Sequence, residues 1–460
     1  MFLALLIFLT PITAIGGLSA FGELSSQLTS YLVFASILYY AFVIYQDILK
    51  SSPEIKIFLI SFVAAIMLSF ATSISEISAN NEYGRSGYDK FLSAAIVVLF
   101  GFFVLLITFR SLRIYRSSDK FGLLLARPML WATYLNAFVG LFELSSWFIG
   151  PITPIYDLLS YYVFHTQHGF IDMPGRLRAL GTEPSHLGTF AGFALPWLLA
   201  FRKTKPAPYT LAIILVTLIA ALSTSRTAYV SLLIVYALYW PLKLLISRNA
   251  AMTVTMLFVG ALAVNLGALL YVYLGGAAVD QSLTGDGGVS NTTRSATIYA
   301  AIDMFLDNPL TGSGLGQGGF GLVKRMPSWA YRSYEISAFE NSREGSTAPI
   351  FSLPARVAAE MGLAGLAALY GSLTYILYRV LSLRAATKNI DRSADCENAT
   401  LAVAISMFSI IGVGLSVGSI RLIMIWVTIG CAGYLISYYS AVRRQGMQPT
   451  ELRNLPAFGE

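Results

Sequence analysis

The residues of this chain best suited to chemistry are arginines that lie on the non-cytoplasmic side of the membrane, where basic residues are uncommon. Of its 31 lysines and arginines, 19 fall in loops that we assign to the cytoplasm, and the other twelve, ten of them Arg, fall on the opposite side. Basic residues normally collect on the cytoplasmic side of a membrane protein. Because a guanidinium group can bind phosphate through two hydrogen bonds, the outer arginines predict an anionic, phosphate-bearing ligand.

Three outer arginines stand near predicted helix starts. Arg226 follows Ser223-Thr-Ser225 in a tight corner and opens the next helix, where free N–H groups and the helix dipole favour an anion. Arg294 opens a helix in a long outer loop in the same way. Arg356 lies one turn before Glu360, which also allows an i,i+4 ion pair that only stabilises the helix. The alternatives are a side chain reaching lipid headgroups for Arg226 and a solvated surface charge for Arg294.

The densest polar run reads Arg176-Leu-Arg178-Ala-Leu-Gly-Thr-Glu183-Pro-Ser-His186. In a short extended segment alternate side chains point the same way, so Arg176 and Arg178 are expected side by side. Glu183 and His186 follow them and are suited to accepting a proton. The alternative for Glu183 is a helix-entry residue next to Pro184.

Membrane-spanning helices must position these side chains. The chain is 56% hydrophobic and 12% charged, and apolar runs of about 20 residues recur along it. We predict an all-α polytopic integral membrane protein with about 12 transmembrane helices, forming a single membrane domain over residues 1–460. The predicted spans lie near 1–20, 28–47, 56–75, 91–109, 128–150, 187–201, 207–223, 227–246, 251–274, 354–378, 399–418 and 421–440.

Basic residues near the span ends set the orientation. With twelve spans, all the strongly basic loops and the C-terminal tail lie on one side of the membrane, so both termini are predicted to be cytoplasmic. The first span has no basic segment before it, and we interpret it as a helix rather than a signal peptide. The formal net charge of +7 is then a membrane signature and predicts no nucleic-acid partner.

Residues 151–186 form an outer segment too long for a simple connector. Within this predicted periplasmic loop, Ile155–Phe170 is typical of an interfacial helix along the headgroup layer. The segment also holds all three histidines of the chain. His165-x-x-His168 with Asp172 is too loose a spacing to predict a metal site, and we predict none.

Residues 275–353 form the large periplasmic loop. A helix is expected over Thr293–Phe305, with Thr292 as its N-cap. Its apolar face would hold Ile298, Ile302 and Phe305.

The same loop contains the glycine-rich motif Gly312-Ser-Gly-Leu-Gly-Gln-Gly-Gly-Phe-Gly321. Gly314, Gly316 and Gly319 spell the dinucleotide pattern G-x-G-x-x-G, but that pattern requires a preceding strand and cytoplasmic nucleotide, so no cofactor is predicted. Two interpretations remain, a flexible turn or a backbone nest that approaches a phosphate or sugar closely.

The order of these motifs resembles a known family. The corner Ser223-Thr-Ser-Arg226 precedes a large loop with Arg294 and Asn308-Pro-Leu-Thr-Gly-Ser-Gly-Leu-Gly316, and a helix with Glu360-Met-Gly-Leu-Ala-Gly365 follows. This arrangement resembles the O-antigen polymerase and O-antigen ligase superfamily, best over residues 181–370. The resemblance implies a GT-C-type glycosyltransferase.

The resemblance further implies a metal- and nucleotide-independent enzyme that uses undecaprenyl-diphosphate-linked oligosaccharides at the periplasmic face of the bacterial inner membrane. Membrane lipid and a chain-length regulator protein are further candidate partners. In that family, arginines of the corner and the large loop hold the lipid diphosphate, which implies this role for Arg226 and Arg294. We add Arg176, Arg178 and Arg356 as candidates, since arginine clamps can stabilise charge that develops on a leaving group.

The resemblance is closer to the polysaccharide polymerases. Similar ligases carry a His late in the large loop, whereas residues Thr347–Pro354 contain none. The run Glu183-Pro-Ser185 also resembles polymerases. One alternative is an O-antigen ligase that transfers glycan to lipid A core. An alternative of another class is a flippase or transporter, for which Glu143, an ionisable residue in a predicted span, is the main candidate.

The predicted reaction joins two lipid-linked substrates. Glu183, or else His186, would accept the proton of the attacking sugar hydroxyl group. Several outer aromatic residues are candidates for stacking on sugar rings, although such residues also form interfacial belts. These are Tyr161, Tyr162, Trp329, Tyr331 and Tyr334.

Overall fold

The computed structural model describes residues 2–13, 15, 24, 27–37, 51–82, 84–114, 121–162, 175–274, 289–341, 349–390 and 393–445. Within them, seven helices are long and apolar enough to cross a membrane. Six of them are α3 (Pro53–Thr72), α5 (Gly87–Ile114), α10 (Arg226–Ser247), α11 (Ala251–Tyr273), α17 (Ala394–Gly414) and α18 (Ile423–Gln445). The seventh is the run of α15 (Leu353–Leu366), η9 (Ala367–Gly371) and α16 (Ser372–Thr387), which follow one another without a loop. The predicted all-α polytopic architecture is confirmed.

Three further helices of the bundle are described: α6 (Leu123–Phe148), α8 (Pro184–Phe201) and α9 (Pro206–Leu222). They coincide with the spans expected near 128–150, 187–201 and 207–223. α8 is the central one, because it packs against α10 and α17 and every residue from Phe190 to Phe201 is buried. Gly188 allows the close approach of α10, since a Cβ there would lie 2.3 Å from the Ala228 nitrogen.

The core continues where α5 and α18 meet. The indole of Trp426 packs against Phe58, Phe62 and Phe102 with ring centroids 5.6 to 6.4 Å apart. Gly101 makes room for it, because a Cβ there would lie 2.0 Å from the indole. Trp426 Nε1 donates to the Ile420 carbonyl at 2.9 Å. This bond ties the turn at residues 415–422 to the core, and that turn forms part of the site described below.

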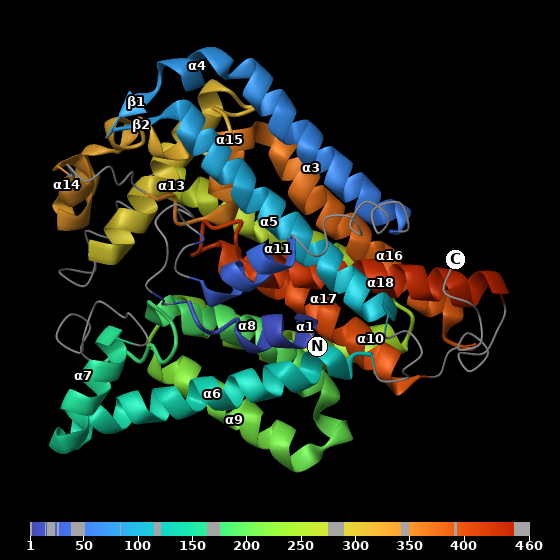
Figure 1. Ribbon diagram of the computed structural model, residues 1–460. Helices are drawn as coiled ribbons and strands as arrows, with labels where there is room; N and C mark the ends of the chain where they lie inside the picture. The colour runs from blue at the N-terminus through green and yellow to red at the C-terminus, as the bar shows by residue number, and fades with distance from the viewer. Residues whose placement is uncertain are drawn as a thin grey trace.

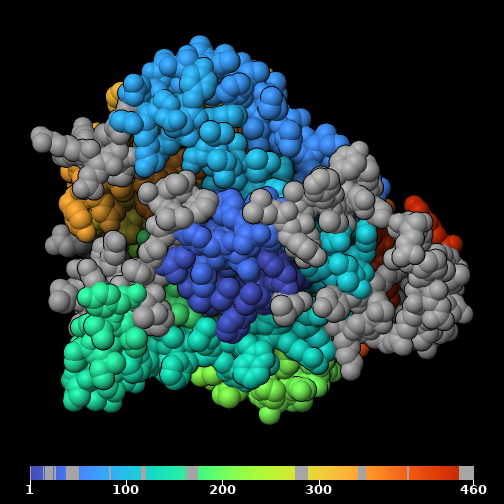
Figure 2. Space-filling view, viewed as in Figure 1, coloured from blue at the N-terminus to red at the C-terminus, as the bar shows by residue number. Residues whose placement is uncertain are grey.

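The predicted first span, residues 1–20, is wrong in its extent. α1 covers only Phe2–Phe8, and Pro11, whose nitrogen carries no hydrogen to continue a helix, follows shortly after. Seven helical residues extend only about 10 Å, a third of the hydrocarbon thickness. α1 packs against α6 and α5, and Figure 2 shows this segment in dark blue on the surface. The second predicted span contains the helix Leu28–Ile37; residues 38–47 lie outside the described part.

The bundle has two unlike ends (Figure 1). At one of them, which we call the loop end, lies the 19-residue helix α13 (Val289–Asp307) together with the short elements: α4 (Ile74–Ala79), the paired strands β1 (Asn81–Glu82) and β2 (Arg85–Ser86), η3 (Gly150–Ile152), α7 (Thr153–Tyr162) and α14 (Tyr334–Asn341). We call the other end, where α16 and α18 finish, the tail end. The described parts of both long outer segments lie at the loop end.

α7 carries exposed Ile155, Leu158 and Tyr162 at helical spacing. A helix therefore exists over Thr153–Tyr162, within the stretch where one is expected, and its interfacial placement stays a prediction. The remainder of the expected helix, residues 163–170, lies outside the described residues.

α13 is the helix expected in the large loop, but it begins earlier. It starts at Val289, so Thr292 lies inside the helix and is not its N-cap. Ala296, Ile298 and Met304 are buried, while Ile302 and Phe305 are only partly so. Three one-turn helices, η6 (Gln317–Gly319), η7 (Val323–Arg325) and η8 (Ser328–Arg332), connect it to α14. The loop is therefore a folded layer over this end of the bundle.

The glycine-rich motif is an ordered insertion into a broken helix rather than a flexible turn. α15 is interrupted at Gly362, whose φ is +62°. The N–H groups of Ser313 and Gly314 donate to the carbonyls of Ala359 and Glu360, at 2.9 and 3.0 Å. Gly312 must be Gly, because a Cβ there would lie 2.4 Å from the Glu360 carbonyl carbon. The glycines thus satisfy backbone groups that the break in α15 leaves without helical partners.

Candidate active site

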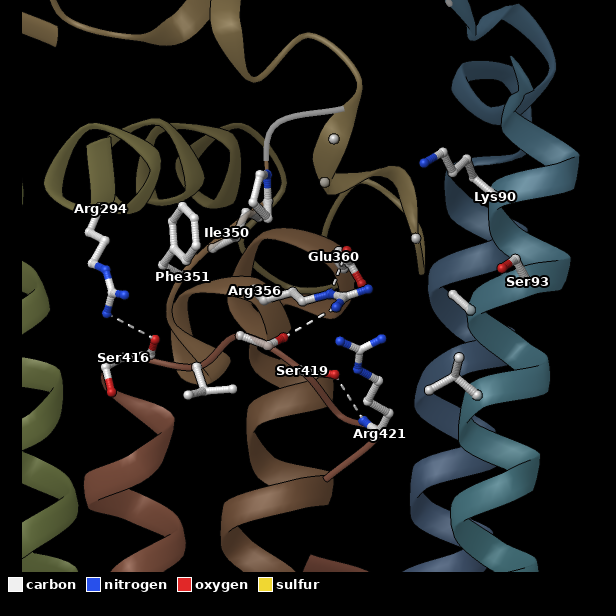
Figure 3. A pocket seen from close by; sticks show the side chains of 18 of the residues that line it. Lys90, Ser93, Arg294, Ile350, Phe351, Arg356, Glu360, Ser416, Ser419 and Arg421 are labelled. Atoms are coloured by element: carbon white, nitrogen blue, oxygen red, sulfur yellow. Dashed lines mark hydrogen bonds and ion pairs between the residues drawn. The ribbon is translucent and has the colours of Figure 1, made fainter. Parts of the chain in front are cut away.

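A pocket of about 610 Å³ opens at the loop end. Small-molecule sites typically have volumes of this order. Its walls are the first turns of α5 and α8, Arg294 of α13, the glycine segment 316–319, the start of α15 and the turn 415–422. Figure 3 shows the side chains from α5, α13, α15 and this turn. Segments from distant parts of the sequence therefore meet at one cavity.

The pocket is cationic. The charged residues among those that line it are Arg85, Lys90, Arg294, Arg356 and Arg421, with the carboxylates Glu183 and Glu360. Five cations against two carboxylates give these lining residues a formal charge of +3. Such a cavity attracts an anion, and its partly buried walls strengthen that attraction relative to open water.

Arg294 extends from α13 over the ring of Phe351, with 5.2 Å between the guanidinium carbon and the ring centroid. Its Nη1 donates to the Ser416 carbonyl at 3.4 Å. Burial lowers the pKa of Arg294 from its ordinary value, Glu183 opposes that change, and Arg226 adds to it. The guanidinium group is thus held in a partly desolvated place among other charges.

Arg226 and Arg176 lie beside the pocket rather than among its lining residues. Both are exposed, and both interact electrostatically with Arg294. Arg226 is the first residue of α10, where the sequence predicts it. Its neighbour Thr227 shares a 2.7 Å hydrogen bond with Ser416, so the corner is tied to the turn that Arg294 contacts. The corner and the loop helix are therefore brought together.

Arg356 makes the expected i,i+4 ion pair, with 3.1 Å between its Nε and Glu360 Oε1. Its Nη1 also donates to the Gly418 carbonyl at 3.2 Å, as Figure 3 shows. Both partners line the pocket. Glu360 is only 3% exposed, and its Oε2 has no hydrogen-bond partner among the described residues. The ion pair therefore does not remove Arg356 from the site; it holds the guanidinium at the pocket wall.

Glu183 is the N-cap residue of α8 and also lines the pocket. Ser185 Oγ donates to its carboxylate at 3.1 Å, and the Glu183 N–H donates to Nδ1 of His186 at 3.4 Å. Because Nδ1 accepts, the ring proton lies on Nε2. Desolvation lowers the pKa of His186 to about 4; Glu183 opposes the shift and Arg421 adds to it. The ring is therefore neutral at pH 7 and leaves the charge of the pocket unchanged.

The prediction that Arg178 points with Arg176 toward a ligand is wrong. Arg178 is 2% exposed, and its Nε lies 3.7 Å from Glu143 Oε1. The same carboxylate accepts the N–H groups of Arg178 and Ala179 at 3.0 and 2.7 Å. Ala179 has a φ of +51°, so the segment turns inward instead of staying extended. Glu143, the candidate for a transport role, is accordingly a structural partner of Arg178.

The aromatic candidates lie apart from the pocket. Trp329 packs against the cluster of apolar residues around α13, and Tyr331 and Tyr334 are exposed on η8 and α14. Tyr162 is exposed on α7, and the side chain of Tyr161 lies outside the described residues. Among the described residues that line the pocket, Phe351 is the one aromatic side chain, and the sequence motifs did not single it out.

Sequence reasoning also missed Arg85, Lys90 and Arg421 as individual site residues. All three belong to the twelve outer cations, so sidedness was the signal that marked them. What the sequence did not show is that β2, α5 and the turn before α18 reach the same cavity. Arg421 follows Gly418 and Ser416, whose carbonyls hold Arg356 and Arg294. The turn at residues 415–422 thus contacts both Arg294 and Arg356 and also contributes Arg421 to the pocket.

Within the described ranges, no group of three or more His, Cys, Asp and Glu side chains is placed to hold a metal ion. His165, His168 and Asp172 fall outside those ranges. The glycine segment contributes Gly316, Gly318 and Gly319 to the pocket wall. Of the two interpretations of the motif, close backbone approach to a ligand is the one its position favours.

A helical bundle of membrane-spanning length with a cationic pocket at one end defines a multi-pass membrane protein. Comparison with protein families is more specific: residues 211–370 match the family described as O-antigen ligase. This match supports the O-antigen ligase and polymerase superfamily, whose members transfer glycosyl groups, and it does not separate the polymerase from the ligase type. No curated protein matches the chain. The matched region contains Arg226, Arg294 and Arg356, and the transporter alternative receives no support.

Proposed function

We propose that this protein is a bacterial surface-polysaccharide polymerase that transfers undecaprenyl-diphosphate-linked glycan onto a lipid-linked repeat unit. The family match implies lipid-linked oligosaccharide substrates and a polymerase or ligase type of reaction. The observation that carries the proposal is the +3 pocket at the loop end, formed by the segments that the charge balance assigns to the periplasm. We infer the inner membrane and a periplasmic active face from the same charge balance.

The proposed reaction needs a diphosphate site and a proton acceptor. Arg294 and Arg356 would bind the donor diphosphate from the pocket wall, with Arg226 adding positive charge beside it. The acceptor hydroxyl oxygen attacks the anomeric carbon, the bond from that carbon to the diphosphate oxygen breaks, and the lipid diphosphate leaves with the electron pair. Glu183 takes the hydroxyl proton. The arginines stabilise the charge that grows on the leaving group.

The polymerase type is favoured by the end of the large loop. Similar ligases carry a His in this stretch, just before the helix that corresponds to α15 of this chain. Here Phe351 lies in the pocket against Arg294, two residues before α15 begins. An apolar ring at this position cannot exchange protons, so the proton-handling group must come from elsewhere in the pocket.

The test is the surface glycan of a deletion strain, complemented with wild-type protein or with Arg226→Ala. A single repeat unit on lipid A in the deletion strain is the expected result. Polymer stranded on the undecaprenyl carrier would instead identify a ligase, and an unchanged profile would refute both. Long polymer made by Arg226→Ala at normal protein level would remove Arg226 from the mechanism.

A further inference from the structure

The imidazole of His186 lies where two cavities of the loop end adjoin. His186 lines the cationic pocket, and it also lines a smaller cavity of about 80 Å³, to which the N-terminal segment contributes Thr10, Pro11 and Thr13. The ring is therefore part of the pocket wall. What it offers a ligand depends on which of its two nitrogens is already bonded within the protein.

Nδ1 of His186 is bonded. The Glu183 N–H can only donate, and it lies 3.4 Å from Nδ1. The Thr182 hydroxyl oxygen lies 2.7 Å from the same nitrogen, and that of Thr13 lies 3.1 Å from it. Because Thr13 Oγ1 accepts the Thr182 N–H at 3.3 Å, its own hydrogen is available to donate to Nδ1. These groups hold the ring in place and keep the Nδ1 lone pair engaged.

Thr13 belongs to the segment whose composition predicts a membrane span over residues 1–20. The helix ends at Phe8 instead, and the Thr13 N–H donates to the Leu180 carbonyl at 3.3 Å. Because α1 ends early, the chain that follows reaches the start of α8 and places a hydroxyl group against His186. The N-terminal segment thus contributes to the site through His186.

Nε2 of His186 is the nitrogen left for a ligand. It carries the ring proton, because Nδ1 accepts, and it donates to no group among the described residues. The ring is neutral at pH 7, since its pKa is about 4. A neutral imidazole in the first turn of a helix can act in catalysis as a hydrogen-bond donor. In a pocket whose lining carries +3, the acceptors that such a donor meets are the oxygens of a bound anion.

His186 also has a structural role as the third residue of α8. Its side chain accepts the N–H of the N-cap residue Glu183, an interaction that Glu or Gln usually makes at this position. This capping role uses Nδ1 alone and needs neither Nε2 nor a place at a cavity. Because Glu and Gln can both replace His as the cap, they can separate the two roles.

We propose that His186 donates a hydrogen bond through Nε2–H to a phosphate oxygen of the substrate diphosphate, and that Thr13 and Thr182 are positioning residues that fix its tautomer. The inference rests on the proposed function, because the ligand is the lipid diphosphate that Arg294 and Arg356 bind. The hydrogen bond strengthens as negative charge develops on the leaving group. His186 is then not the proton acceptor that the sequence also allowed.

Three variants separate a donor from a base and from a helix cap. His186→Gln keeps a cap acceptor and an N–H donor, His186→Glu keeps the cap acceptor without a donor, and His186→Ala has neither. Polymer formation is measured in the deletion strain, per amount of folded protein. We expect the Gln variant to stay within about tenfold of the wild type, and the Glu and Ala variants to fall about 100-fold, the usual cost of removing one donor to a developing charge.

The matched control is Ser93→Glu, which adds the same charge to another wall of the pocket. It should lower activity less than His186→Glu does; an equal loss would attribute the effect to charge alone and overturn the donor role. Equal activities of the Gln and Glu variants would reduce His186 to a helix cap. A Glu variant more active than the Gln variant would identify a base.

A second measurement reports contact with the ligand directly. ¹⁵N spectra of full-length, histidine-labelled protein in lipid nanodiscs distinguish protonated from unprotonated ring nitrogens, and His165→Gln with His168→Gln leaves His186 as the one labelled residue. We expect Nε2 to be protonated at pH 7 and its signal to shift when farnesyl diphosphate binds. Thr13→Val with Thr182→Val should raise the fraction of rings protonated at Nδ1 and lower activity together.

The outcomes separate the donor role from the proposed function. A ring protonated at Nδ1 in the wild type, or an Nε2 signal that stays in place while calorimetry shows farnesyl diphosphate to bind, would overturn the donor role and leave the proposed function intact. Unchanged tautomers in the Thr13→Val, Thr182→Val protein would remove these two residues from positioning. Absence of farnesyl diphosphate binding would refute diphosphate recognition itself, and the donor role with it.

Discussion

The two ends of the bundle differ in where most of their cations stand along the helices. At the tail end, helix starts carry Glu54 and Asp395, and helix ends carry Arg113, Arg443 and Arg444. This is the arrangement that complements helix dipoles. At the loop end, cations stand at or near several helix starts: Lys90 on α5, Arg226 on α10, Arg356 on α15 and Arg421 before α18. Each end also has exceptions, because Asp89 and Glu183 stand at helix starts of the loop end and Lys56 is the fourth residue of α3 at the tail end.

Both ends contain ion pairs. At the tail end, Arg379 lies 2.7 Å from Glu54 and Arg384 lies 3.5 Å from Glu397. Elsewhere at the loop end, Arg325 lies 2.9 Å from Asp303 and 2.6 Å from Asp307. At the loop end the pocket lining keeps an excess of positive charge. The described ion pairs of the tail end stabilise the fold, whereas the cationic pocket lining of the loop end favours the binding of an anion. The cations of a membrane protein are therefore best judged by which helix end they occupy.

The largest expected effect is the loss of activity in Arg294→Gln. Removing one preorganised donor to a developing negative charge typically lowers the rate about 100-fold or more. Polymer formation should fall by that factor in a deletion strain carrying the variant, while the thermal midpoint in detergent stays within error or rises. The exposed-residue control Arg332→Gln should retain full activity. Equal losses of activity in both variants would mean that Arg294 has no specific role in the reaction.

The glycines test whether the loop end is locally strained. At Gly362, φ is +62° and a Cβ would lie 2.4 Å from the Leu310 carbonyl carbon, so Gly362→Ala should destabilise the protein by about 3 kcal/mol. Gly371, further along the same helix, has helical angles and open space around it. Gly371→Ala should therefore stabilise by up to about 1 kcal/mol. Urea unfolding in detergent measures both, and similar values for the two would contradict the broken helix.

At the tail end a change of charge should affect stability instead. Arg379→Gln leaves Glu54, which is 3% exposed, without its ionic partner. Because Arg379 is itself a third exposed, we expect a loss of about 2 kcal/mol rather than the full value for a buried pair. Adding Glu54→Gln should recover part of the loss, and activity per folded molecule should stay normal. If Arg379→Gln lowered activity without lowering stability, the tail end would have a role in activity, which contradicts the difference between the two ends.

The helices could be predicted from the sequence because a membrane imposes a simple length and composition rule. Ten of the predicted spans coincide with described helices or with the α15–α16 helix. The prediction of the first span was wrong in its extent, because it was based on the apolar composition of residues 1–20. That composition does not register Pro11, and the helix ends before it, at Phe8. Hydropathy measures preference for lipid, not the continuity of backbone hydrogen bonds.

The candidate site was only partly predictable. Arg226, Arg294 and Arg356 stand near helix starts, a local property that sequence displays. The predicted orientation of Arg178 was wrong, because its side chain pairs with Glu143, which belongs to α6. Arg421 and Lys90 were missed for the converse reason, since their meeting depends on how α5 and α18 pack. Which side a residue faces can be predicted from charge balance, but which residues share a cavity depends on tertiary packing.

The smallest prediction concerns the signs of two substitutions at helix starts. Asp395 stands in the first turn of α17 and accepts the Gly122 N–H at 2.9 Å, so Asp395→Asn removes charge that favours both interactions. A loss of about 1 kcal/mol is expected. Lys90 occupies the same kind of position on α5 with the opposite charge, and Lys90→Gln should raise stability by about 0.5 kcal/mol.

The two effects should shrink together as salt rises, because exposed charge–dipole interactions are screened. Urea unfolding at low and high ionic strength provides the measurement. If Lys90→Gln lowered stability in the same way as Asp395→Asn, Lys90 would be part of the supporting structure of α5. Its position at the pocket would then need no ligand to explain it.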